Sequence, residues 1–104
     1  MLSKYVGKNK FGGYTYQIKL DSLFHIYINE TENNLFLVEF KEFKWISFKT
    51  HFTFISKSNI EETIIDTFEK VYEFYDNHPK YEWSEQACRN KLNHVLDLLD
   101  RIEK

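Results

Sequence analysis

The chain has 104 residues, of which 42% are hydrophobic and 18% aromatic. This length accommodates one domain with one hydrophobic core, and the apolar content argues against a disordered chain, so we expect a single domain over residues 1–104. The net charge of -2 at pH 7 argues against a uniformly basic nucleic-acid binder.

Residues 14–55 alternate between apolar and polar side chains. The apolar residues favour even positions in four runs, 14–20, 24–28, 36–40 and 46–54. This period of two, in β-branched and aromatic residues, predicts strands with one packed and one wet face. Connections are expected at 20–22 and 29–34, and a turn over 41–44 precedes a last strand over 45–55. We therefore predict a four-stranded antiparallel meander, and the segment before Gly12 is a candidate for a further short edge strand.

The period changes at Ser58, where two amphipathic helices are predicted to begin. Ser58 followed by Glu61 is a capping-box signature, and a helix starting there is expected to end at Asn77-His78-Pro79. A second helix is predicted from near Ser84. The apolar stripes of the two helices are Ile60, Ile64, Phe68, Val71 and Tyr75, and then Cys88, Leu92, Val95, Leu99 and Ile102. The order predicts a two-layer α+β fold, a sheet-forming half (1–57) and a two-helix half (58–104), with both helices on the even face of the sheet.

The first predicted helix carries an acidic stripe opposite its apolar face. The stripe consists of Glu62, Asp66, Glu69, Glu73 and Asp76, whose spacings of three and four place them on one line. A solvated helix face is the ordinary interpretation of such a pattern. However, Lys70 is the only basic residue of this helix, and the last two acids oppose the helix dipole. The stripe is therefore a candidate docking surface for a protein with a basic surface.

The odd face of the sheet is predicted to carry a second candidate surface. Its apolar and aromatic residues are His25, Tyr27, Leu35, Leu37, Trp45, His51 and Ile55. Such a composition is typical of a protein interface, with Tyr27, Trp45 and His51 as candidate contacts. The N-terminal segment covering the patch, or residues too scattered to touch, are the alternatives. An exposed patch would bind a foreign protein or a second copy of this chain, giving a homodimer through the sheet.

Catalytic and metal-binding patterns are weak in this sequence. Asp21, with Glu39 and Lys41 two residues apart, has the residue types of a restriction-type, metal-dependent nuclease. A match this short is expected by chance in a chain rich in both residues, and no histidine or cysteine stands at metal-ligand spacing. Lysines and aromatics over residues 4–19, including Lys8 and Lys10, offer an alternative in nucleic-acid binding. We expect no enzyme activity, no cofactor and no metal.

Several features bear on origin and location. Abundant Lys, Asn, Ile, Phe and Tyr beside a single alanine come from AT-rich codons, which suggests a low-GC bacterium or one of its phages or mobile elements. One cysteine, Cys88, excludes an internal disulfide and suits a reducing compartment. No apolar run resembles a signal peptide or a membrane span, so we expect a cytoplasmic protein that uses no membrane.

Together these features favour a small non-enzymatic protein-binding module. The most concrete version is a phage or mobile-element antagonist of a host protein. The first alternative is a nucleic-acid-associated protein that uses the basic N-terminal half. The second alternative is a metal-dependent nuclease built on Asp21, Glu39 and Lys41.

Overall fold

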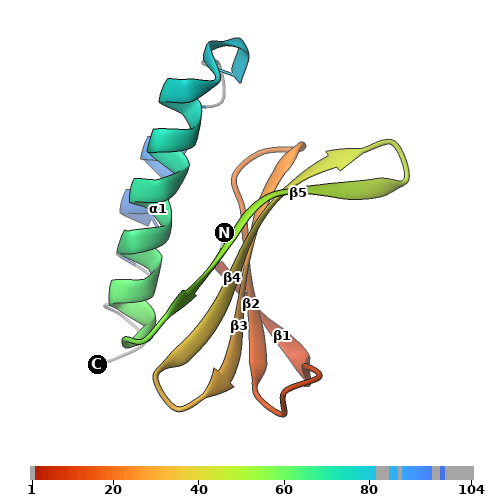
Figure 1. Ribbon diagram of the computed structural model, residues 1–104, viewed down its shortest axis with the longest axis vertical. Helices are drawn as coiled ribbons and strands as arrows, with labels where there is room; N and C mark the ends of the chain where they lie inside the picture. Colours follow the sequence, from red (N-terminus) through yellow and green to blue (C-terminus); the bar gives the residue numbers. More distant parts are fainter. Residues whose placement is uncertain (1, 82–84, 87, 95–96, 98–104) are drawn as a thin grey trace.

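The fold is a single antiparallel sheet with helices on one face (Figure 1). The computed structural model describes residues 2–81, 85–86, 88–94 and 97. The strands pair in chain order and are β1 (Leu2–Lys8), β2 (Tyr14–Lys19), β3 (Phe24–Glu32), β4 (Leu35–Lys44) and β5 (Ser47–Ser56). Helix α1 (Ile60–Asn77) and a short 3-10 helix, η1 (Pro79–Tyr81), follow, and helical residues resume at 85–86, 88–94 and 97. The predicted α+β fold, with its four-strand meander followed by two helices, is confirmed, and β1 is the further edge strand.

The loop between β1 and β2 depends on two glycines. Gly12 has a φ of +89°, which residues with a Cβ rarely adopt. A Cβ on Gly13 would collide with the carbonyl oxygen of Glu30, so only glycine allows this loop to lie against β3. The side chain of Asn9 closes the same contact by donating to that carbonyl oxygen at 3.0 Å.

The core lies between α1 and the even face of the sheet. Its fully buried large side chains from the sheet are Ile18, Phe24, Ile26, Ile28, Val38 and Phe40, and from α1 they are Ile64, Phe68 and Val71. Stacked rings of Phe24 and Phe40, with centroids 5.3 Å apart, hold neighbouring strands together at its centre. The period-two pattern therefore assigned these side chains of the strands to the correct face of the sheet.

The β4–β5 hairpin turns later than predicted. The expected turn over 41–44 is wrong, because β4 continues to Lys44, and Lys44 pairs with Ser47 across a two-residue turn. The turn residues are Trp45 and Ile46, and Trp45 has a φ of 58°. A positive φ at the first turn position alone fits a type II′ turn, where glycine is the favoured residue.

A β-bulge in β5 overturns a second prediction. Phe40 pairs with Phe52, but Lys41 pairs with Thr50, so His51 is an extra residue in β5. Because side chains alternate between faces, one extra residue exchanges the faces of the strand on its far side. Phe48 therefore lies on the outer face, 5.3 Å from the ring of Phe43, and Ile46 is exposed in the turn rather than in the core.

The N-cap of helix α1 lies one residue after the predicted cap, and the helix ends where predicted. The N-cap is Asn59, whose side-chain oxygen accepts from the backbone N–H of Glu62 at 2.8 Å, so the expected cap at Ser58 is wrong. Asparagine and serine are equally good caps, and sequence does not separate neighbours of this kind. At the other end the Nδ1–H of His78 donates to the carbonyl oxygen of Phe74 at 2.9 Å.

The second helix contributes to the same core. Cys88 is fully buried, Leu92 packs against the core, and the guanidinium of Arg89 lies 4.5 Å from the ring of Tyr72 on α1. Cys88 is thus part of the core, as its place in the predicted apolar stripe indicates, and burial raises the pKa of its thiol to about 12. The predicted stripe residues Val95, Leu99 and Ile102 lie outside the described residues. Within the described chain, no helix has the length and apolar character needed to cross a membrane.

Candidate functional site

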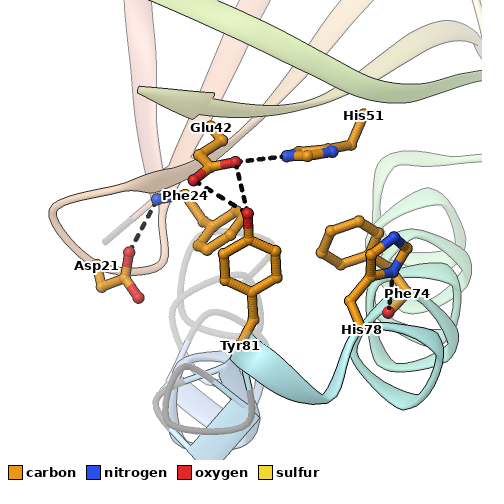
Figure 2. Close-up of polar contacts among 7 residues, drawn as sticks. All are labelled: Asp21, Phe24, Glu42, His51, Phe74, His78 and Tyr81. Carbon is orange, nitrogen blue, oxygen red and sulfur yellow. Dashed lines mark hydrogen bonds and ion pairs between the residues drawn. The ribbon is translucent and has the colours of Figure 1, made fainter. Parts of the chain in front are cut away.

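A buried polar cluster closes one end of the core (Figure 2). Glu42 of β4 is only 7% exposed and points into the core face, where its Oε1 accepts from Nε2 of His51 at 2.8 Å. The hydroxyl of Tyr81 in η1 donates to both carboxylate oxygens, at 3.1 and 3.3 Å. Three segments distant in sequence are thus joined at one carboxylate.

The surroundings of this cluster are aromatic. The ring centroids of His51 and Phe74 lie 4.8 Å apart, and the ring of His78 stacks on that of Phe74 with centroids 4.2 Å apart. Burial raises the pKa of Glu42 most strongly, but the hydrogen bonds from His51 and Tyr81, with the charge of Lys44, outweigh it and leave the pKa below its usual value. We interpret the cluster as a structural anchor between the sheet and the helices.

His51 does not belong to the outer sheet face, where the sequence placed it. The bulge turns its side chain inward to Glu42, and His25 stays on the outer face, so the two histidines lie on opposite faces. An available signal was missed. Glu42 is a charged residue at the even position that follows the apolar Phe36, Val38 and Phe40, and such a buried carboxylate needs partners.

The centre of the outer face is a network of half-buried polar side chains. Tyr27 lies within it, with its hydroxyl accepting from the side-chain amide of Gln17 at 3.4 Å and its ring 5.6 Å from the ammonium of Lys41. Burial raises the pKa of Tyr27 and lowers that of His25, whose Nε2 is buried without a hydrogen-bond partner among the described residues. Tyr27 therefore lies on the outer face as predicted, but its hydroxyl and its ring already contact polar side chains of this protein.

The strongest apolar exposure lies at the β4–β5 hairpin tip, defined here as Phe43, Trp45, Ile46 and Phe48. Trp45 is 91% exposed, Ile46 is 99% exposed and Phe48 is 43% exposed. The tip extends away from the body of the sheet (Figure 1). The aromatic ring of the tip that contacts Tyr27 is that of Phe48, with centroids 6.2 Å apart. Trp45, another of the three predicted contacts of the sheet face, lies in the turn.

The acidic stripe is exposed along its whole length on α1. Three of its members, Asp66, Glu69 and Glu73, line a groove between α1 and β5, and Glu62 and Asp76 lie outside it. The ammonium of Lys70 crosses this groove and lies 5.0 Å from the ring of Phe54. The sequence placed the five carboxylates correctly on one face, but the groove beside them required the tertiary structure.

The nuclease residues do not form a metal centre. Asp21 accepts two backbone hydrogen bonds in the β2–β3 turn, from Leu23 and Phe24 at 2.9 and 2.8 Å. Glu39 instead accepts from the amide of Asn29 at 3.0 Å and pairs with Lys41 at 3.4 Å on the outer face. No group of three His, Cys, Asp or Glu side chains with metal-binding geometry occurs in the part of the chain that the structure describes.

The residues of the nucleic-acid alternative also have other contacts. Lys10 lies in the exposed β1–β2 loop, with its ammonium 5.2 Å from the ring of Phe11. Tyr16 packs against the core, so its ring is not a free stacking platform.

The sequence matches no family model, no curated protein and no solved structure.

Proposed function

We propose that this protein is a non-enzymatic protein-binding module whose principal contact is the hairpin tip. The most concrete form is an antagonist of a host protein, encoded by a phage or mobile element of a low-GC bacterium and acting in the cytoplasm. The abundance of residues that AT-rich codons encode supports this origin. The geometry of the tip supports the binding role.

The observation that carries the proposal is the conformation and exposure of Trp45. Its φ of 58° is a left-handed conformation that normally costs a bulky residue about 1–3 kcal/mol. It is also 91% exposed, next to an isoleucine that is 99% exposed, so packing within the fold offsets little of this strain. A tight turn that presents tryptophan where glycine is favoured is well suited to place one rigid aromatic anchor in a pocket of a partner.

The experiment is affinity capture from a lysate of a low-GC host, followed by mass spectrometry. A Trp45→Ser/Ile46→Ser double variant is compared with wild type, and Phe11→Ser is the matched control, because Phe11 is 43% exposed in the β1–β2 loop, at the end of the sheet opposite the tip. Circular dichroism first establishes that all three proteins are folded.

We expect wild type and the Phe11→Ser control to capture the same protein and the double variant to lose it. With the purified partner, the dissociation constant should rise by about 30-fold or more, as for an interface residue worth at least about 2 kcal/mol. Equal affinity of the double variant would contradict the proposal and move the binding surface away from the tip.

A further inference from the structure

The outer edge of β5 has no neighbouring strand. β5 is the last strand of the sheet, with β4 on one side and no strand of the described chain on the other. Such an edge presents backbone N–H and C=O groups that readily pair with an added strand. Proteins often protect an edge with lysine or proline, but neither occurs in the stretch from Phe52 to Ser56. The bulge at His51 bounds this stretch at one end. Ser56, which is 6% exposed and hydrogen-bonded to Thr63 of α1, bounds it at the other, so the four residues 52–55 form the open edge.

A groove runs along this edge and α1 forms its other wall. One section, of about 450 Å³, is lined by residues 54–58 of the chain and by Asp66, Glu69, Lys70 and Glu73. A second section, of about 320 Å³, is lined by residues 51–54 and, from α1 and its C-cap, by Lys70, Glu73, Phe74, Asn77 and His78. Both sections contain Phe54, Lys70 and Glu73, so they form one groove in which β5 and α1 run in opposite directions.

The helix wall of the groove is acidic and its floor is apolar. Asp66, Glu69 and Glu73 line the wall, against Lys70 on the helix and Lys57 at one end. Phe52, Phe54 and Phe74 supply the aromatic surface. Because Lys70 lies over Phe54 and all three carboxylates are exposed, a basic side chain entering the groove meets more negative than positive groups.

The spacing of the carboxylates fits the spacing of a strand. Along α1, Asp66 and Glu69 are about 4.5 Å apart and Glu69 and Glu73 about 6 Å apart in axial rise. Side chains on one face of an extended segment recur about every 6.7 Å. Lysine or arginine at every second position of an added strand therefore reaches these carboxylates, because long side chains absorb the small mismatch.

We infer that the β5 edge and the acidic wall of α1 bind an extended basic segment of a partner protein as an added strand. A second copy of this chain is a poorer occupant, since pairing two β5 edges would bring two acidic α1 faces together. The inference deepens the proposed function by specifying the chemistry of the partner, but it uses residues separate from the hairpin tip.

The test uses blocked seven-residue peptides with lysine at every second position and valine or threonine between. Two versions carry backbone N-methyl groups, one on the lysines and the other on the intervening residues, so each version blocks one edge of the peptide strand. A version with glutamate for lysine is the charge control. Binding is followed by NMR shifts of the backbone amides of this protein.

Strand addition predicts that one N-methylated version binds like the parent, while the other binds at least about tenfold more weakly. Shifts should concentrate at residues 52–57, and the glutamate version should not bind. Equal binding of both N-methylated versions would overturn strand pairing and leave only charge attraction. No binding of any peptide would also overturn the inference, while leaving the effect of the Trp45→Ser/Ile46→Ser variant intact.

A matched pair of protein variants tests the acidic wall. Asp66→Asn/Glu69→Gln/Glu73→Gln removes the three groove carboxylates, and Glu61→Gln/Glu62→Gln/Asp76→Asn removes three exposed carboxylates of the same helix outside the groove. The first variant should weaken peptide binding by about tenfold and the second by less than about threefold. Equal weakening would show that net charge alone attracts the peptide and would overturn the assignment of the groove.

Discussion

The two halves of β5 have similar aromatic sequences and opposite environments. Phe52, after the bulge, stacks on Phe40 with ring centroids 5.1 Å apart and packs against the core. Phe48, before the bulge, lies on the outer face and is 43% exposed. One strand thus serves as part of the core at one end and carries an exposed aromatic surface at the other.

The bulge residue explains why this division is stable. By turning His51 inward, the bulge brings a hydrogen-bond donor to Glu42, which would otherwise be a buried carboxylate with Tyr81 as its only side-chain partner among the described residues. The same change of register turns Phe48 outward. Satisfying a buried charge and exposing an aromatic side chain are therefore two results of one extra residue.

The largest expected effect comes from truncating one phenylalanine in each half. Phe52→Ala should lower the free energy of unfolding by about 3 kcal/mol, because it removes core packing against Phe40. Phe48→Ala should lower it by about 1 kcal/mol, since its ring contacts, with Phe43 and Tyr27, lie on an exposed surface. Urea unfolding followed by circular dichroism measures both. Equal losses would contradict the division of β5 into a core half and an exposed half.

A smaller effect is expected at the boundary between the halves. Glu42→Gln should lower the free energy of unfolding by about 1–3 kcal/mol at neutral pH, because it weakens charge-assisted hydrogen bonds from His51 and Tyr81. The folded-state pKa of Glu42 lies below its usual value of 4.5, so ionised Glu42 stabilises the fold above that pH, and the contribution is lost as pH falls through the folded-state value.

Unfolding of wild type and Glu42→Gln as a function of pH checks this sign. The difference in the free energy of unfolding between the two proteins should be constant above about pH 5 and should shrink on acidification. A difference that grows as pH falls would contradict the assignment of Glu42 as an ionised, hydrogen-bonded anchor.

The smallest expected effect has the opposite sign. Trp45→Gly should raise the free energy of unfolding by about 0.5–1 kcal/mol, because glycine adopts the φ of 58° without strain and little packing is lost. Asn34 has a similar φ of 57° in the β3–β4 turn, and Asn34→Gly is a matched control whose gain should be smaller, since asparagine tolerates this conformation. Destabilisation by Trp45→Gly would indicate that the tryptophan supports the fold.

Much of the fold follows from the local sequence. The alternation over 14–40 determined which side chains of β2, β3 and β4 face the core, because residues 15–19 pair regularly with β3 and residues 24–30 pair regularly with β4. The helical spacing after Asn59 likewise determined that Glu62, Asp66, Glu69, Glu73 and Asp76 share an exposed face. Both patterns depend only on the geometry of single elements.

The environments of Phe48 and His51 were decided only by tertiary structure. A bulge leaves no mark in a pattern of alternating residues, because the aromatic residues on both sides of it still stand at even positions. The groove beside α1 is likewise invisible in sequence, since it depends on how the helix lies against an unpaired strand edge. Local periodicity determines the faces of each element, whereas register and edge pairing depend on contacts between elements distant in the chain.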